Sequence, residues 1–203
     1  MNQKLEKLLK YCGEQFKKEW NLQWDNVVRK IFNENPSNTD VEAVLLKVVV
    51  LNSLYQTYIF DIDKMKEHIV RLGKKLDILL ISGDLESVNN IRHGHRIRAN
   101  NERKTDMDAY SFSTKYCHWS NPDAYPMMDQ YVYKAIMRLK KDAFIEGFKG
   151  DDLWDIKEFK KVIDNIRENT GIKTYKDIDR SLWIYGHYND PQYGEIKKEL
   201  MRY

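Results

Sequence analysis

The sequence predicts an all-α protein, and its composition and its residue pattern both support this prediction. The 203 residues include only four Pro and nine Gly, so the residues that usually interrupt helices are few. Apolar residues recur at helical spacing, as Leu5, Leu8, Cys12 and Phe16 do near the N-terminus. Hydrophobic residues make up 42% of the chain and charged residues 32%, which is typical of a globular protein. We therefore expect a compact domain of about eight helices.

The helix boundaries follow from the apolar spacing and from capping residues. After a turn at residues 35–38, Thr39 or Asp40 is the expected N-cap of a helix that is apolar on most faces. Such a helix is expected to lie at the centre of the fold. Asp61 or Asp63 should cap the next helix, which ends at residues 82–84. The other expected helices span residues 3–20, 41–59, 110–119, 129–140, 155–169, 174–185 and 192–202.

The chain shows no internal repeat, low-complexity tract or linker, so we expect one domain over residues 1–203. Gly171 and Gly186 lie where glycine C-caps of the late helices are expected.

A polar, basic stretch from residue 89 to residue 108 lacks apolar periodicity and is expected to be a loop or a short hairpin. It is either a phosphate clamp or a solvated loop. The candidate phosphate ligands are Arg92, Arg96, Arg98 and Lys104. His93 and His95 lack the spacing of a metal-binding motif, so we expect neither a metal nor a cofactor.

Several classes of protein are disfavoured by the composition. A net charge of +3 is too small to indicate nucleic-acid binding by the whole surface, so a local basic cluster is required. No segment resembles a signal peptide or a membrane-spanning helix. Cys12 and Cys117 are far apart, which favours the reducing cytoplasm as the compartment. Glycine-rich phosphate loops and nucleophile elbows are missing from the sequence.

Two segments resemble the helix-hairpin-helix DNA glycosylases, the enzymes of base-excision repair. Residues 51–57 (LNSLYQT) are similar to a stretch that lines the family's base pocket, with Gln56 and Thr57 matching directly. Residues 113–132 are similar to the catalytic block, in which an acid opens a helix and is followed by x-x-valine, as Asp129 is here. The resemblance covers about residues 40–140 and implies a glycosylase-like core there, with residues 155–203 forming C-terminal helices.

The resemblance implies roles for several residues. Asp129 would stabilise the positive charge that develops on the sugar, or it would simply cap its helix. Lys115 would form a Schiff base or hold a phosphate, or it would be an ordinary surface lysine. Stacking on an extruded base would fall to aromatic side chains that could equally be core, and Gln56 would wedge into the duplex or bond to backbone. The candidate base-binding residues are Gln56, Tyr110, Tyr116, His118 and Trp119.

Two departures from the family pattern keep a second interpretation open. Gly94 stands alone where the family hairpin has two glycines, and Ser111 stands near the place of the family's nucleophilic lysine. Residues 178–186 are similar to a motif of bacterial proteins of unassigned function. We therefore expect a nucleic-acid-binding protein, with DNA as the expected partner, that is either an N-glycosylase or a catalytically inactive nucleic-acid- or protein-binding module. The pattern does not determine the substrate base or the oligomeric state.

Overall fold

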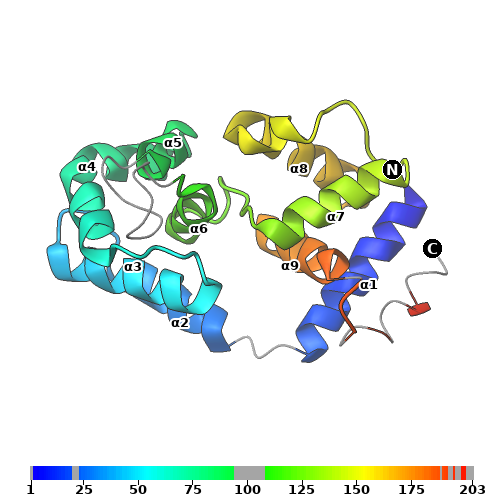
Figure 1. Ribbon diagram of the computed structural model, residues 1–203, viewed down its shortest axis with the longest axis horizontal. Helices are drawn as coiled ribbons and strands as arrows, with labels where there is room; N and C mark the ends of the chain where they lie inside the picture. Colours follow the sequence, from blue (N-terminus) through cyan, green and yellow to red (C-terminus); the bar gives the residue numbers. More distant parts are fainter. Residues whose placement is uncertain are drawn as a thin grey trace. The chain divides into compact units, whose positions relative to one another are not determined.

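The all-α prediction is confirmed by a computed structural model of the protein. It describes residues 2–19, 23–93 and 108–187, and near the C-terminus residues 189–191, 194, 198 and 199. In these ranges the chain forms α-helices and one 3₁₀ helix and no β-strand (Figure 1). The helices are α1 (Gln3–Glu19), α2 (Gln23–Glu34), α3 (Val41–Tyr55), α4 (Ile62–Ser82), α5 (Glu86–Arg92), α6 (Tyr110–Ser120), α7 (Gln130–Lys141), η1 (Asp151–Trp154), α8 (Ile156–Thr170) and α9 (Tyr175–Gly186).

The chain divides into two compact units. Unit 1 contains Met1–Asn21 together with Pro126–Tyr203, and unit 2 contains Leu22–Tyr125. The boundary at residues 125 and 126 falls inside the expected glycosylase-like core of residues 40–140. One cooperative domain over residues 1–203 stays a prediction, since two packed units can still unfold together.

Unit 2 contains α2 to α6, and α6 is its most fully buried helix. Nine of the eleven residues of α6 are buried, and the helix contacts α2, α3, α4 and α5. The expectation that residues 41–59 form the buried central helix is wrong, because α3 leaves Val41, Leu46 and Val49 about half exposed. An all-round apolar helix gives no sequence signal for the face that its neighbours will cover.

The end of α3 also differs from the prediction, since the helix stops at Tyr55 and not at residue 59. Gln56 follows with a positive φ of 47°. The Asn52 carboxamide then holds the returning chain: its Oδ1 accepts from the Ile59 N–H at 2.8 Å, and its Nδ2 donates to the Ile59 carbonyl at 3.0 Å. The predicted cap of the next helix is confirmed, because Asp61 accepts from Lys64 N at 3.1 Å.

Two helices of unit 2 were not predicted. Helix α2 has only Val28 and Phe32 as buried residues, so its apolar stripe is narrow. Helix α5 has seven residues and extends to Arg92, so the expected loop from residue 89 begins later. The remainder of that predicted loop, residues 94–107, lies outside the described residues, as does most of the predicted helix at 192–202.

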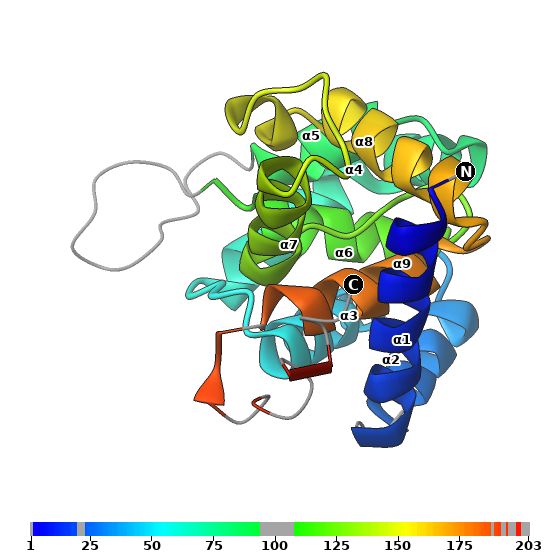
Figure 2. The ribbon, with the colours of Figure 1, turned by 90° about the vertical axis from the view of Figure 1, so that its right-hand side faces the viewer.

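Unit 1 joins the N-terminal helix to the last third of the chain. Helix α1 packs along α9 and also contacts α8, while α7 packs on α9. Figures 1 and 2 both show α1 alongside α9. The buried side chains of α1 are Leu5, Leu8, Leu9 and Cys12. Three of the four residues whose spacing predicted this helix are thus buried, and the fourth, Phe16, is half-buried.

The two glycines of unit 1 have different roles. Gly171 is the C-cap of α8 with a φ of 68°, as predicted. Gly186 is not a C-cap but the last residue of α9, and His187 follows as the cap. A Cβ atom at Gly186 would lie 2.2 Å from the Tyr131 carbonyl oxygen. This glycine therefore permits close backbone packing of α9 on α7.

Within the described ranges, no helix has both the length and the apolar character that crossing a membrane requires.

Candidate functional site

The predicted aromatic residues lie in α6, and some of their polar groups form hydrogen bonds inside the protein. Tyr116 donates a hydrogen bond through its hydroxyl to Asn38 Oδ1 at 2.5 Å. The His118 Nδ1 lies 2.7 Å from the Tyr125 carbonyl oxygen, which fixes the segment after α6. Tyr110, Tyr116, His118 and Trp119 are each at most 4% exposed. These four side chains are therefore part of the folded interior.

Lys115 lies on the same helix in a polar cluster that sequence reasoning found only in part. Its Nζ donates to Ser111 Oγ at 2.9 Å and lies 5.8 Å from the ring centre of Tyr55. Trp119 donates through Nε1 to the Tyr55 hydroxyl at 3.1 Å, and this hydroxyl donates to Asp25 at 3.2 Å. Because Lys115 is only 3% exposed, it is not an ordinary surface lysine.

Gln56 is the residue that follows Tyr55 of this cluster, and its side chain is exposed. Its left-handed backbone places it at the C-terminus of α3, the position that the sequence indicated.

Asp129 caps α7 in unit 1. Its Oδ1 accepts hydrogen bonds from Tyr131 N at 2.8 Å and from Val132 N at 2.9 Å. The capping role, which was the alternative to a catalytic role for an acid at the start of a helix, is therefore confirmed. Two bonds to one oxygen hold the plane of the carboxylate, and the residue is half-buried.

Three rings pack together near Asp129: the rings of Tyr131 and His187 are stacked, and Trp183 is tilted against His187. His187 lies 3.4 Å from the ring centre of Tyr131 and 3.8 Å from that of Trp183. Burial lowers the pKa of His187, although its bond to the Trp183 carbonyl and the charges of Asp190 and Asp129 oppose this shift. A lowered pKa leaves this imidazole mostly neutral at pH 7.

A basic face of α7 was missed by sequence reasoning. The helix contains Lys134, Arg138, Lys140 and Lys141 and no acidic residue. Three of these cations border a groove of about 480 Å³ that Gly186 and Asp190 also line: Lys134, Arg138 and Lys141. Their spacing of four and then three residues places them on one side of the helix, and this spacing was the available sequence signal.

Of the four predicted phosphate ligands, Arg92 is the one that lies within the described residues. Its guanidinium is ion-paired with Asp108 at 2.6 Å and lies 4.3 Å from the ring centre of Tyr110. Burial would raise the pKa of Asp108, but hydrogen bonding and attraction from Arg92 outweigh it and the pKa is lowered. Arg96, Arg98 and Lys104 lie outside the described residues.

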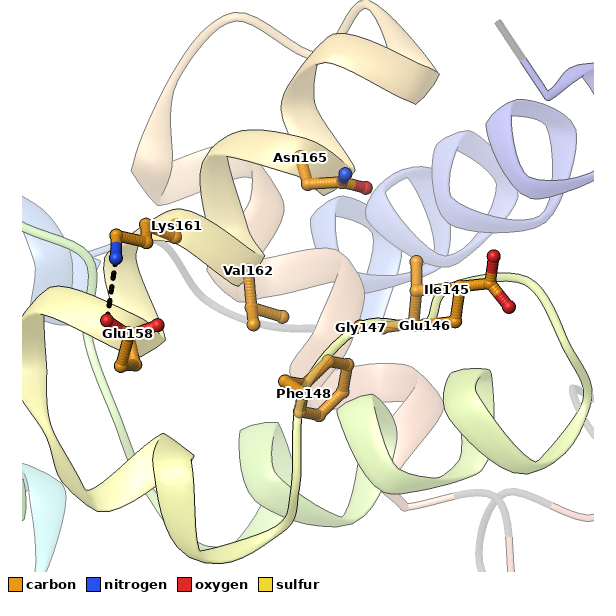
Figure 3. A pocket seen from close by; sticks show the side chains of 8 residues that line it. All are labelled: Ile145, Glu146, Gly147, Phe148, Glu158, Lys161, Val162 and Asn165. Carbon is orange, nitrogen blue, oxygen red and sulfur yellow. Dashed lines mark hydrogen bonds and ion pairs between the residues drawn. The ribbon is translucent and has the colours of Figure 1, made fainter.

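A further pocket of about 170 Å³ lies between the loop after α7 and the face of α8 (Figure 3). Its lysine, Lys161, is paired with Glu158 at 2.6 Å. The pocket therefore lacks the unbalanced positive charge that an anionic ligand requires. The described residues also contain no group of three or more His, Cys, Asp or Glu side chains placed to hold a metal ion.

The predicted catalytic residues lie in different units, Lys115 in unit 2 and Asp129 in unit 1. Each has a defined environment within its own unit. A shared catalytic role for the two stays a prediction.

The fold and these sites define an all-helical protein of two units, one with a basic helix face and one with a buried polar centre. A family model described as an N-terminal domain, HI_0787_N, matches residues 4–124. A Haemophilus influenzae protein named "Uncharacterized protein" is 36% identical over 150 residues, which cover 73% of this chain and 69% of the relative. The chain belongs to the HI_0787_N family. No solved structure matches it.

The family match and the structure share one boundary. The matched segment ends at residue 124, one residue before unit 2 ends. At its start, however, it includes α1, which packs in unit 1.

Proposed function

We propose that the protein binds nucleic acid along α7 and uses Asp129 to cleave an N-glycosidic bond, as the resemblance to the helix-hairpin-helix glycosylases implies. The observation that carries this proposal is the placement of a fixed carboxylate at the start of a helix whose exposed side is basic.

The basic face of α7 supports the binding step. Lys134 and Lys141 are exposed and border a groove, so a phosphate backbone can reach them without unfolding the helix. Neutralising phosphates with such side chains releases counterions, which drives binding at low salt. The half-buried rings of Tyr131 and Trp183 would add flat apolar surface in the same unit.

Asp129 supports the catalytic step. Cleavage of an N-glycosidic bond builds positive charge on the sugar, and an oriented carboxylate stabilises that charge. The two backbone N–H bonds to Oδ1 fix this carboxylate before substrate binds, so no reorganisation is needed. Lys115 would hold a phosphate or act as the amine in this scheme.

A second candidate function is binding without catalysis. It is favoured by the environment of Lys115, whose Nζ is buried and bonded to Ser111. A lysine held in this way cannot attack a sugar without first leaving its pocket. A module that binds nucleic acid through α7 would then remain.

Binding is tested with the double variant Lys134→Gln/Lys141→Gln on duplex DNA at several salt concentrations. We expect weaker binding and a salt slope smaller by about two, since each phosphate contact contributes about 0.9. The matched control is Lys157→Gln/Lys161→Gln on α8, which removes the same charge from another exposed helix face. Equal effects of the two double variants, or no binding by the wild type at low salt, would refute the proposed surface.

Catalysis is tested by base release from a panel of damaged duplexes, with wild type compared with Asp129→Asn. Asn is also a good N-cap, so the variant should keep the fold while losing the charge. We expect the release rate to fall by at least about a hundredfold. If the wild type releases no base from any duplex but still binds, the enzyme proposal fails and the binding module stands.

A further inference from the structure

Unit 2 contains a buried lysine that the proposed function does not use. Lys47 lies in α3 and is only 1% exposed. Its Nζ donates to Asn38 Oδ1 at 2.7 Å and to the Ser37 carbonyl oxygen at 3.1 Å. These two bonds leave one position on the nitrogen for another partner, because an ammonium has three hydrogens.

The groups around this nitrogen favour a cation. Asp77 of α4 holds Asn38 in place, accepting from its backbone N at 3.0 Å and from its Nδ2 at 2.7 Å. The rings of Phe32 and Tyr116 lie 5.5 Å and 5.3 Å from Lys47 Nζ, within the range of a cation–π contact. These acceptors and ring faces therefore stabilise a positive charge on the Lys47 nitrogen.

Lys47 borders a cavity. The cavity has a volume of about 250 Å³ and lies wholly within unit 2. Its wall combines the polar Lys47 and Asp77 with apolar side chains, namely Phe32, Pro36, Leu80 and Ile81. A small molecule with one polar end and one apolar end fits this mixture.

Burial also changes the acidity of the amine. Desolvation lowers the pKa of Lys47 to about 8, although attraction from Asp77 and Asp40 opposes the shift. The described titratable side chains that act on it are thus Asp77 on α4 and Asp40 before α3, and Tyr116 on α6 contributes its ring. At pH 7.5 about a quarter of the molecules would carry the neutral, nucleophilic amine.

We propose that Lys47 and its cavity form a covalent binding site for small aldehydes. The neutral amine attacks the carbonyl carbon and gives a carbinolamine. One proton from the nitrogen and one from solvent then leave with the carbonyl oxygen as water, and a C=N bond forms. The product is an iminium cation with one remaining N–H.

The surroundings explain why this product would persist. The iminium carries its positive charge where the ammonium had it, so Asp77 and the two rings continue to stabilise it. Its remaining N–H can still donate to Asn38 or Ser37. All of these residues lie in unit 2, so the inference is independent of the surface proposed on α7.

The test uses the full-length wild-type chain with propionaldehyde and sodium cyanoborohydride between pH 6 and pH 10. Peptide mass mapping then gives the alkylation rate of each lysine. We expect Lys47 to be alkylated about tenfold faster than Lys30 at pH 7.5, with a midpoint near the pKa of its amine. Lys30 is the internal control, because it is on α2 of the same unit with a side chain that is 71% exposed.

Two variants complete the experiment. Lys47→Arg should remove the fast alkylation and leave that of Lys30 unchanged. Asp77→Asn keeps an oxygen for Asn38 but loses the charge, so the midpoint of alkylation should move to lower pH. The proposal is overturned if Lys47 reacts no faster than Lys30, or if it reacts only after urea has unfolded the chain.

Discussion

Lys47 shows how much one buried charge can affect this protein. Two acceptors bond its nitrogen, yet desolvation still lowers the pKa of Lys47 to about 8. The folded state therefore binds the Lys47 proton less tightly than the unfolded chain does. By linkage, this difference makes the free energy of unfolding depend on pH.

The dependence has a definite sign. Between about pH 8 and pH 10.5 the unfolded chain holds a proton at Lys47 that the folded chain has released, so stability rises with pH. We expect the wild type to gain about 2 kcal/mol relative to Lys47→Met between pH 7.5 and pH 9.5. Urea unfolding at both pH values measures this gain.

Comparison with Lys47→Met removes the other groups that titrate in this range. Burial raises the pKa of the Cys117 thiol to about 12 and raises that of Cys12 as well. These thiols are present in both proteins, so their contributions cancel. Parallel stability curves for the two proteins would contradict the lowered pKa of Lys47.

Residue-level prediction from the sequence worked where a local rule applied. Asp129 was placed at a helix start as an acid that follows an extended segment and opens the next helix, and the cap is present. Lys47 was missed, although a single lysine within the apolar run of residues 43–51 was a visible signal. Its partners Asn38 and Asp77 are 39 residues apart in the chain, so only the fold brings all three together.

Helix packing in unit 1 depends on a glycine whose role was predicted incorrectly. At Gly186 a methyl group would lie 2.2 Å from the Tyr131 carbonyl oxygen, which belongs to the backbone and cannot rotate away. The sequence suggested a C-cap, because it shows that a glycine is near a helix end but not what approaches it.

We expect Gly186→Ala to lower the free energy of unfolding by about 3 kcal/mol, since α7 and α9 would have to separate. The matched control is Gly150→Ala, whose φ of −58° and ψ of −37° suit alanine. There a Cβ atom would meet the Tyr133 hydroxyl at 3.1 Å. The control should change stability by less than about 1 kcal/mol. Urea unfolding measures both variants, and equal effects would contradict the close packing of the two helices.

The position of the central helix could not be predicted from the sequence either, because a local pattern does not show which helices pack around a segment. Both α3 and α6 are rich in apolar residues, and the sequence favoured α3. The structure surrounds α6 with four helices, so even its Ser113, Thr114 and Lys115 become buried. Burial of these polar residues is a property of the neighbours and not of the helix itself.

The two units predict which helices lose stability when a buried side chain is shortened. Unit 1 is formed from both ends of the chain, and α1 contributes the fully buried Leu9 to it. Leu9→Ala should leave a cavity that costs about 3 kcal/mol. We expect this variant to speed up amide hydrogen exchange in α7 and α9, which belong to unit 1. Exchange in α3, α4 and α6 of unit 2 should change less, because the free energy of local opening follows the packed units.

The control for this prediction is Lys10→Ala at the next position of the same helix, where the side chain is 54% exposed. It should leave exchange in both units nearly unchanged. If Leu9→Ala accelerates exchange equally in both units, the two units unfold as one, and the single domain expected from the sequence is supported.

Local sequence patterns specify the all-α class, most helix boundaries and the caps at Asp61, Asp129 and Gly171. These properties depend on residues within a turn or two of one another, so local spacing carries them. Contacts between distant segments specify which helix is central, why Gly186 is a glycine, how α1 shares a unit with the last third of the chain, and that Lys47 meets Asn38 and Asp77 beside a cavity. Each of these depends on groups that are distant in the chain, and no local pattern specifies which distant groups will meet.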